Sequence, residues 1–485
     1  MRILNLVLVS VLGYSTVYYL AVLAVSVVSL RELARLRPST SQYERDVVRD
    51  RLPGVSILMP AYNEEVVIVE TVHSALLSDY PNIEVIVVSD GSKDRTVALL
   101  VEEFGLTRHD PPTPGPIACK AIRAVYRHRD LQLVVVDKEP SGAKADGVNC
   151  GINLARHDWI VIMDADEITE PDALLRVMVE VVNSPVRVVG AGITLLPANG
   201  ISVENGRVID APVPMNYWVG CQLIEYLSSF MLYKPGMSAL GAMPNISGGF
   251  GVYDRNAVLA VGGLAHGHLG EDMDLIMRVH RHFLELGEPY TMVEVPEAIV
   301  WTEFPSTRSV LERQRVRWHR GLRQVLQSNK AMIGRRRYGR LGVLTLPFLL
   351  LFEWVAVPLE AMGVVMLLVL AITGGLNGQA ALSLFAACQL LGTLITFTAV
   401  FAADRYLGRY QKPRDLARLL WFATISQFGF RQLTLFWRLK SLRKTAYVWG
   451  EMTRTGFGKK PGAIGASPPP LTAPADLPSS LDGNL

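Results

Sequence analysis

The sequence predicts an α/β domain with a mostly parallel, Rossmann-like sheet, joined to α-helices that span a membrane or lie at its surface. Between residues 55 and 301, short β-branched runs alternate with segments of helical spacing. This pattern is typical of a parallel sheet that is covered by helices on both faces. Elsewhere the apolar residues gather in long runs, and 50% of all residues are hydrophobic. Runs of about 20 apolar residues are long enough to cross a bilayer.

The N-terminal segment, residues 1–30, is predicted to be a transmembrane helix. Residues 3–30 contain no charged side chain, and three arginines follow within residues 31–37. A cleaved signal peptide has its basic residues before a shorter apolar core, so this run is interpreted as a retained anchor. The arginines after the run place its C-terminal end in the cytoplasm. Residues 31–52 are interpreted as a linker.

Residues 53–302 are predicted to form the α/β domain. Four β-branched runs bounded by turn residues predict strands, and the segments between them predict helices. The strands are VSILM (55–59), EVIVVS (84–89), LQLVVV (131–136) and WIVIM (159–163), and the helices are 64–77, 94–104, 143–156 and 171–183. In sheets of this kind, ligands bind beyond the carboxyl ends of the strands.

One stretch of this domain departs from the pattern. Residues 105–130 contain four prolines between positions 111 and 116, and proline at this density does not form regular structure. We expect a surface insertion there.

The region after the α/β domain is predicted to contain interfacial and membrane helices. Residues 303–340 should include an amphipathic interface helix, and residues 341–437 the membrane helices. Segments 341–373 and 380–402 are each long enough to span a bilayer. The prolines at 347 and 358 should kink the first of them, or split it into an interfacial piece and a span.

The last apolar segment, residues 415–437, carries basic residues on both flanks. A single crossing would leave one basic flank outside, so we expect an interfacial or re-entrant helix. Residues 438–460 are interpreted as a cytoplasmic segment. Residues 461–485, rich in Pro, Ala and Ser without periodicity, are expected to be disordered.

The net charge and the spacing of the cysteines argue against several kinds of partner or site. The net charge is only +3, so nucleic acid is not an expected partner. Basic residues cluster beside apolar segments, as they do at a cytoplasmic membrane face. The four cysteines show no paired spacing, which argues against a disulfide framework and against a zinc site.

Acidic side chains follow two of the predicted strands. Asp164 and Asp166 come directly after the strand WIVIM, where two carboxylates can share Mg²⁺ or Mn²⁺, and that cation can also bind a diphosphate. The alternative is a solvated acidic turn. Asp90 follows the strand EVIVVS, and the alternative to a nucleotide contact there is an ordinary helix cap.

Two further segments lie at the same edge of the predicted sheet. Tyr62 and Glu64 close the first strand, where an aromatic ring can stack on a base and a carboxylate can accept its N–H. Lys144 opens the helix before WIVIM, next to Gly142, and is suited to a phosphate or a sugar hydroxyl. An exposed lysine in a first helical turn is the alternative reading of Lys144.

The pair Glu271 and Asp272 follows a glycine-rich turn and starts a helix predicted over residues 273–285. Carboxylates in a first turn are stabilised by the helix dipole, so helix capping is one interpretation. The other is that Asp272 acts as a general base toward a sugar hydroxyl. Upstream, the flexible segment from Ser247 includes Phe250, an aromatic ring that could support an acceptor sugar.

The predicted interface helix carries the run QRVRW at residues 314–318. Two cations, an amide and an indole within five residues suit an anion that lies beside a ring system. A solvated basic helix face is the alternative. Together with the acidic sites before it, the run favours a membrane-embedded sugar polymerase.

With these motifs assembled, the chain resembles the processive, inverting family-2 glycosyltransferases, whose catalytic domain has the GT-A fold. The family includes bacterial cellulose synthase, hyaluronan synthase, the chitooligosaccharide synthase of nodulation and poly-N-acetylglucosamine synthase. The resemblance covers about residues 50–455. It extends to Trp449–Arg454, which is similar to a segment that follows the last membrane helix of some members.

On the donor side, the resemblance implies contacts to a UDP-sugar. Tyr62 and Glu64 would contact uracil and Asp90 the nucleoside. The diphosphate would be held through Mg²⁺ or Mn²⁺ by the D-x-D carboxylates, chiefly Asp166. The residues implied in donor binding are Tyr62, Glu64, Asp90, Lys144, Asp164, Gln314, Arg315 and Arg317.

On the acceptor side, Asp272 would be the general base, with Glu271 beside it. Trp318 would lie beneath the acceptor sugar, with Phe250 and Ser247 nearby. The resemblance implies transfer of a hexosyl or N-acetylhexosaminyl unit to a growing β-linked polysaccharide. A rival enzyme would add one sugar to a lipid acceptor. A non-catalytic membrane scaffold is the rival from another class, and it would have no use for these carboxylates.

The resemblance also implies a location and partners. The enzyme would be a multi-pass protein of a bacterial inner (plasma) membrane, with its catalytic domain in the cytoplasm. Its partners would be the UDP-sugar, a glycan or lipid-linked acceptor and the lipid bilayer. Cellulose synthases have more membrane helices than this chain, so an export partner or a homo-oligomer is an open expectation.

Overall fold

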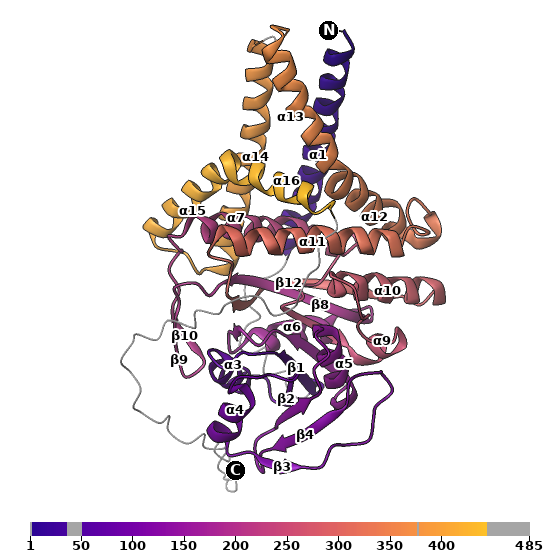
Figure 1. Cartoon of the computed structure of the whole chain (residues 1–485), viewed down its shortest axis with the longest axis vertical. Coiled ribbons are helices and arrows are strands. Elements are labelled where there is room, and N and C mark those ends of the chain that lie inside the picture. The colour runs from indigo at the N-terminus through magenta and orange to yellow at the C-terminus, as the bar shows by residue number, and fades with distance from the viewer. Residues whose placement is uncertain (1, 36–50, 376–377, 444–485) are drawn as a thin grey trace, which may run out of the picture.

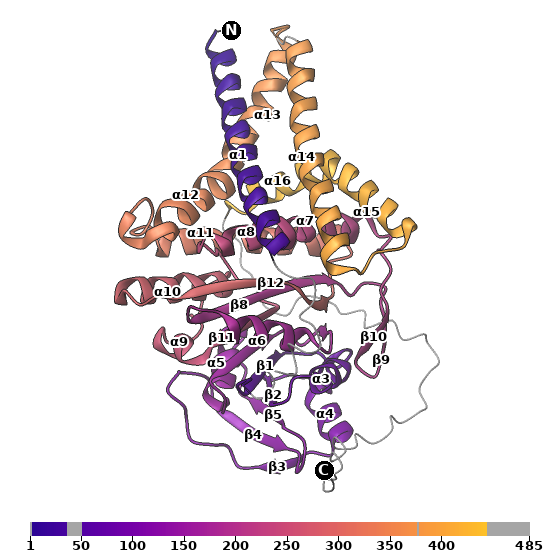
Figure 2. The same cartoon turned by 180° about the vertical axis from the view of Figure 1, so that it is seen from behind.

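The computed structural model describes residues 2–35, 51–375 and 378–443. The α/β domain lies at one end and three long helices extend from the other, with a layer of helices between them (Figure 1). The first helix, α1 (Arg2–Arg35), rises beside α13 (Ala356–Ile372) and α14 (Gly378–Leu407). Figure 2 shows the same grouping from behind. The N-terminal helix therefore packs with two helices from residues 356–407 in one bundle.

The α/β domain is built on one ten-stranded sheet. Its strand order is β3-β4-β5-β2-β1-β6-β11-β8-β12-β7. The strands are β1 (Val55–Ala61), β2 (Ile83–Ser89), β3 (Thr107–His109), β4 (Ile122–Arg127), β5 (Leu133–Lys138), β6 (Trp159–Met163), β7 (Glu167–Thr169), β8 (Val188–Pro197), β11 (Phe250–Asp254) and β12 (Thr291–Thr302). The neighbours β5, β2, β1 and β6 are parallel. These are the four strands predicted from β-branched runs, and the fold class is confirmed.

Both faces of the sheet are buried, which explains why its strands have continuous apolar runs. Along β1, Ile57 and Met59 belong to one core cluster, whereas Leu58 between them belongs to the other. Successive side chains on a strand point to opposite faces, so each face needs an apolar cover. The helices of the α/β domain are α3 (Ile68–Leu76), α4 (Thr96–Phe104), α5 (Lys144–Leu154), α6 (Ala173–Asn183), α9 (Arg255–Ala260) and α10 (Glu271–Leu286).

The prediction for residues 105–130 was wrong at both ends of that segment. β3 and β4 are antiparallel to each other, and β4 is antiparallel to β5, so they extend one edge of the sheet. Only the proline-rich part between them lacks regular structure. Pairing with β5 outweighed the break that the prolines signalled, because Val125 of β4 packs into the core.

The layer between the sheet and the long helices consists of segments that lie across the molecule (Figure 1). Beside the sheet, β9 (Ser202–Glu204) and β10 (Arg207–Asp210) form a separate two-stranded hairpin. The helices of the layer are α7 (Tyr217–Ser228), α8 (Lys234–Ala239), α11 (Arg308–Ser328), α12 (Leu346–Phe348), α15 (Pro413–Ile425) and α16 (Arg431–Lys440). α11 packs on α16, and His319 of α11 shares a 2.8 Å hydrogen bond between its Nδ1 and the Ser441 hydroxyl.

Three helices in the described part of the chain are long and apolar enough to cross a membrane: Gly13–Arg35, Leu341–Ile372 and Phe385–Leu407. The second contains both prolines and is irregular. π-helical turns at Leu341–Thr345 and Leu349–Val355 flank α12, which contains Pro347. α12 lies within the transverse layer and α13 rises from it (Figure 1). This is the split that proline was expected to cause.

Helices α15 and α16 meet at a sharp bend. Phe428 and Gly429 depart from helical geometry, and Gly429 has φ of 90°, a conformation that glycine adopts without strain. Both helices lie across the base of the three long helices (Figure 1), and their interfacial position stays a prediction. The predicted tail at 461–485, the segment Trp449–Arg454 and most of 438–460 lie outside the described residues, as does most of the linker at 31–52.

A buried charged cluster ties three of these elements together. The Lys138 ammonium, at the end of β5, contacts the Asp90 carboxylate and lies 2.7 Å from Asp146 on α5. All three side chains are buried. Removing one partner of a buried ion pair leaves an uncompensated charge, at a cost of about 3–5 kcal/mol.

Lys138→Met is therefore expected to lower the thermal unfolding midpoint of the detergent-solubilised protein by several degrees. The measurement is a thermal scan beside Lys330→Met, which removes an exposed lysine and should leave the midpoint unchanged. Equal midpoints for the two variants would show that the buried cluster contributes no net stability.

Candidate active site

A cavity of about 510 Å³ opens between the carboxyl ends of the central strands and helices α10 and α11. It gathers almost every residue that the sequence singled out. The predicted residues on its wall are Tyr62, Glu64, Lys144, Asp164, Asp166, Ser247, Glu271, Asp272, Gln314, Arg315, Arg317 and Trp318. Asp90 and Phe250 are the two predicted residues outside this lining.

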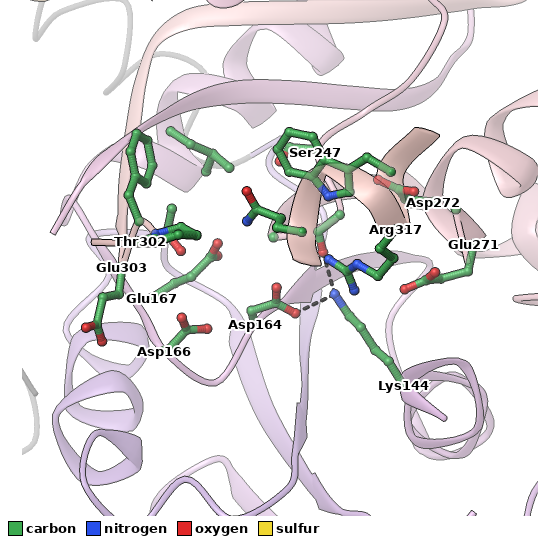
Figure 3. Close-up of a pocket in the computed structure, with 18 of the residues that line it drawn as sticks. Lys144, Asp164, Asp166, Glu167, Ser247, Glu271, Asp272, Thr302, Glu303 and Arg317 are labelled. Carbon is green, nitrogen blue, oxygen red and sulfur yellow. Dashed lines mark hydrogen bonds and ion pairs between the residues drawn. The ribbon is translucent and has the colours of Figure 1, made fainter. Parts of the chain in front are cut away.

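Asp164 and Asp166 extend from the end of β6 into the cavity (Figure 3). The Asp164 backbone N–H donates to the Gly249 carbonyl at 2.7 Å, which fixes the start of this loop. The Lys144 ammonium pairs with the Asp164 carboxylate and donates to the Gly248 carbonyl at 2.6 Å. Burial alone would lower the pKa of Lys144, but Asp164 and Glu271 outweigh it and raise that pKa. Lys144 therefore stays cationic inside the cavity.

The residues of the D-x-D loop are suited to a hard divalent cation. Both side chains offer only carboxylate oxygens, which are the ligands that Mg²⁺ and Mn²⁺ prefer. Among the described residues, no group of three or more His, Cys, Asp or Glu side chains has a geometry that could hold a metal ion. Asp164 and Asp166 are the residues that would hold such a cation.

Glu271 and Asp272 form the first turn of α10, on another wall of the cavity (Figure 3). Asp272 Oδ1 accepts a 2.8 Å hydrogen bond from the backbone N–H of Met273. Burial and the neighbouring Asp272 raise the pKa of Glu271 above its usual value. Figure 3 shows Arg317 and Lys144 pointing into the space between this pair and Asp164. The two acidic sites thus face each other across the positively charged side chains of Lys144 and Arg317.

Helix α11 presents the run QRVRW to the cavity, but its two arginines have different surroundings. The Arg315 guanidinium pairs with Glu225 of α7 and lies 4.6 Å from the centre of the Trp318 ring. Arg315 thus orients the indole, which is 37% exposed. Arg317 points toward Asp164 and Glu271 (Figure 3), which makes it the better placed of the two to meet a diphosphate.

The structure contradicts the prediction for Phe250. Its side chain is only 1% exposed and packs in the hydrophobic core, because Phe250 is the first residue of β11. The glycines before it, Gly248 and Gly249, line the cavity instead. Phe250 therefore offers no ring face to an acceptor.

Asp90 is also placed differently from the prediction. Its carboxylate is 1% exposed and accepts hydrogen bonds from the Ser141 hydroxyl and the backbone N–H groups of Ser141 and Gly142, in addition to contacting Lys138. In this arrangement Asp90 holds the loop that begins α5 and so positions Lys144. A direct nucleoside contact has no support from the geometry.

Two acidic residues of the site were missed by sequence reasoning. Glu225 holds Arg315, and nothing in the sequence of α7 marks it. Glu167 directly follows the D-x-D motif and lines the cavity. Burial, together with Asp164 and Asp166, raises the pKa of Glu167 well above its usual value. The run of three carboxylates at 164–167 was the signal that could have identified it.

The helix that carries Asp272 touches the helix that carries Trp318, backbone against backbone. A Cβ on Gly321 of α11 would lie 2.8 Å from the nitrogen and 3.0 Å from the Cα of Gly270. Beside this contact, the Leu269 N–H donates to the Gln324 side-chain oxygen at 2.8 Å. The approach of the two helices therefore depends on glycine.

Gly321→Ala is expected to separate α10 from α11 and to reduce the turnover number by about 10- to 100-fold, because misplacement by about 1 Å costs that much. The measurement is initial-rate UDP release, together with a thermal scan that confirms folding. Gly13→Ala is the matched control, since a Cβ there would meet nothing within 4 Å. An unchanged turnover number would show that the contact does not position the site.

Two family models match the part of the chain that contains this cavity. The family model "Glycosyl transferase family 2" matches residues 56–110, and "Glycosyltransferase like family 2" matches residues 117–321. The first match contains β1 and β2, and the second runs from the loop before β4 into α11. Together they include the strand ends, the D-x-D loop, the Glu271–Asp272 pair and the QRVRW run.

The chain is also similar to poly-beta-1,6-N-acetyl-D-glucosamine synthases. It is 26% identical to the Staphylococcus epidermidis protein over 276 residues, which is 57% of this chain and 56% of that protein. It is 26% identical to the protein of Staphylococcus aureus strain COL over 281 residues, which is 58% of this chain and 57% of that protein. The chain thus matches little more than half the length of these relatives.

A solved structure shows the same fold at low sequence identity. It is a mannosyltransferase from Pyrobaculum calidifontis in complex with GDP-Man and Mn²⁺, with a TM-score of 0.55 and 17% identity. The similarity covers 88% of this chain and 99% of that one, and it confirms the expected GT-A architecture. From its family matches and its fold, the chain belongs to glycosyltransferase family 2.

Proposed function

We propose that this protein is a processive, inverting transferase that moves a hexosyl or N-acetylhexosaminyl unit from a UDP-sugar to a growing β-linked polysaccharide. The observation that carries the proposal is the convergence in one cavity of the D-x-D carboxylates, the Glu271–Asp272 pair and the QRVRW helix. The relatives named as poly-beta-1,6-N-acetyl-D-glucosamine synthases support a polymer product.

The donor would bind along the carboxyl ends of β1 and β6. Tyr62 and Glu64, on the wall beside β1, are suited to stack on uracil and to accept its N–H. Asp166, with Asp164, would hold Mg²⁺ or Mn²⁺ at the diphosphate, where the cation would neutralise charge on the leaving group. Arg317 and Lys144 add positive charge at the same place.

Transfer needs a general base for the acceptor hydroxyl and positive charge that stabilises the leaving diphosphate. Asp272 would take the proton from the acceptor hydroxyl, whose oxygen attacks the anomeric carbon from the face opposite the diphosphate. The bond from that carbon to the diphosphate oxygen breaks, and UDP leaves. The configuration inverts in this single displacement, so no covalent intermediate with the protein is required.

The acceptor would lie against Trp318, with Ser247 beside it. Trp318→Ala is expected to slow elongation by about tenfold while donor hydrolysis changes less, because stacking against an indole holds the acceptor and not the donor. The measurement compares UDP release without acceptor with the product mass distribution. Equal losses in both would remove Trp318 from acceptor binding.

A transferase that adds one sugar to a lipid acceptor is the second candidate. It is favoured by a second cavity, of about 210 Å³, which shares Trp318 and Arg315 with the first and extends to Leu349 and Arg438 beneath the long helices. A lipid-linked acceptor approaching from the bilayer would meet Trp318 by this route.

The proposed location is a bacterial inner membrane, with the α/β domain in the cytoplasm. The three apolar helices support a membrane protein, and the arginines that follow the first helix support this orientation. The proposal includes an export partner or a homo-oligomer that would join the three apolar helices of the described residues in exporting a polymer.

The test is to incubate the detergent-purified protein with Mg²⁺ or Mn²⁺ and each UDP-sugar in turn, and to follow UDP release and product mass. A ladder of masses from one donor supports the polymerase and identifies its sugar. A single added hexose on a co-purified lipid supports the second candidate. No UDP release from any donor would contradict both.

A further inference from the structure

Two of the four cysteines, which show no paired spacing in the sequence, lie together in the structure. Cys119 belongs to the segment between β3 and β4, residues 110–121, and Cys150 lies on α5. Cys150 is completely buried, whereas Cys119 is half-buried and packs against the same hydrophobic cluster. Neither side chain lines the active-site cavity, so the proposed reaction leaves this pair without a role.

Hydrogen bonds hold the segment 110–121 on α5 at two points. At one point, the Asn153 side chain donates to the Ile117 carbonyl at 2.7 Å and accepts from the Ile117 N–H at 3.1 Å. At the other, the backbone N–H of Lys120 donates to the Asp146 carboxylate at 3.1 Å. The segment therefore runs along the helix from residue 153 toward residue 146.

These two attachments place Cys119 over Cys150. Asp146, Cys150 and Asn153 are separated by four and three residues, so they share one face of α5. Cys119 lies between the two attached residues of the segment, and its sulfur is 3.8 Å from the Asn153 side-chain nitrogen. The two thiols thus face each other between the attachments.

The contact gives the two thiols different acidities. A hydrogen bond from the Cys150 thiol lowers the pKa of Cys119 to about 7 and outweighs burial and the charge of Asp146, which raise it. Asn153 and Lys138 also lower the pKa of Cys119. The same contact, together with burial, raises the pKa of Cys150. The accessible sulfur is therefore partly a thiolate at neutral pH, while its buried neighbour remains a thiol.

This arrangement is suited to oxidation and not to metal binding. In the part of the chain that the structure describes, no group of three or more His, Cys, Asp or Glu side chains could hold a metal ion. Thiolates are the form of cysteine that oxidants attack. An accessible thiol of low pKa beside a second cysteine is the arrangement found in redox-sensitive cysteine pairs.

We propose that Cys119 and Cys150 form an oxidation site, at which hydrogen peroxide converts the two thiols into a disulfide. The Cys119 thiolate attacks one peroxide oxygen, hydroxide leaves, and Cys119 becomes a sulfenic acid. The Cys150 sulfur then displaces that oxygen, which leaves as water with the Cys150 proton. Two electrons pass from the sulfurs to the peroxide. The new bond fastens the segment 110–121 to α5.

The test treats the full-length protein in detergent with hydrogen peroxide at neutral pH, blocks the remaining thiols with N-ethylmaleimide and digests the protein with trypsin without reduction. Cys119 lies in the tryptic peptide 109–120 and Cys150 in the peptide 145–156. We expect mass spectrometry to detect these two peptides joined, and dithiothreitol to separate them. Cys119 should be oxidised about tenfold faster than a thiol with the ordinary pKa of about 8.5, because far more of it is thiolate.

Variants separate the roles of the two cysteines. In Cys150→Ala, Cys119 should stop at the sulfenic acid and react with dimedone. In Cys119→Ser, Cys150 should stay reduced, because it is buried. Cys388→Ser, which changes a half-buried cysteine on α14, is the matched control and should still give the joined peptides. Hydrogen exchange of residues 110–121 should slow several-fold in the oxidised wild type.

Four results would overturn the proposal. Oxidation of Cys119 to sulfinic or sulfonic acid, with Cys150 still a thiol, would show that Cys150 is not its partner. Peptides joined in other combinations, such as two copies of 109–120, would show non-specific oxidation. Two intact thiols, after glutathione in the same solution has been oxidised, would show that the pair is inert. Unchanged hydrogen exchange would show that the disulfide does not fasten the segment.

Discussion

Asp272→Asn is expected to reduce sugar transfer by about 10²- to 10⁴-fold, the range that a general base contributes, while UDP affinity stays within a few-fold of wild type. The physical reason is that Asp272 would meet the acceptor hydroxyl and not the donor. Its carboxylate lies at the start of α10, on a different wall from the D-x-D loop. The measurement pairs initial rates of UDP release with a UDP titration of the same preparation.

Glu271→Gln is the matched control for Asp272→Asn, because it makes the same chemical change one residue away. Glu271 is not the residue proposed to take the proton, so its loss should be smaller. If the glutamine variant lost as much activity as the asparagine variant, Glu271 would share the role of base. If UDP binding collapsed in Asp272→Asn, the assignment of Asp272 would be wrong.

Asp166→Asn is expected to weaken UDP binding on the order of a hundredfold in the presence of Mg²⁺ or Mn²⁺, because a hard cation would lose one of its two protein carboxylates. Wild-type protein treated with a chelator should bind UDP as weakly as the variant does. The variant itself should respond little to the chelator. Titrations of UDP with and without EDTA measure both effects.

Asp172→Asn provides the comparison for Asp166→Asn, since Asp172 precedes α6 and pairs with Arg176 outside the cavity. It should bind UDP as the wild type does. Strong UDP binding by Asp166→Asn with full sensitivity to EDTA would mean that the cation is held elsewhere, and the D-x-D assignment would then fail.

Much of the fold could be predicted because the central strands are buried on both faces. A strand in that position must be apolar along its whole length, and β1, β2, β5 and β6 stand out from the helices for this reason. The edge strand β3 and its neighbour β4 escaped prediction. β3 has only one neighbouring strand, is three residues long and is exposed, and the prolines between β3 and β4 dominated the signal of this segment.

The site was predictable where chemistry and position coincide at a strand end, as at Asp164 and Asp166. It was not predictable where the direction in which a side chain points determines whether it reaches the cavity. Phe250 and Gly249 are adjacent in the sequence, yet Gly249 lines the cavity while the Phe250 side chain packs in the core. Asp90 occupies a strand end like Asp164, but its oxygens are satisfied by Lys138 and the loop at Ser141. In both cases, contacts with residues distant in the sequence determine where the side chain lies.

The contact between Gly270 and Gly321 also limits how this site can vary. No side chain separates the two backbones, so nothing between them can absorb a change in either helix. Asp272, two residues beyond Gly270, and Trp318, three residues before Gly321, are therefore tied to the same point. Replacement of either glycine by a larger residue would displace a whole helix. It would thereby change the distance between Asp272, the proposed base, and Trp318, the proposed acceptor contact. At this junction there is almost no room for a single substitution that adds a side chain.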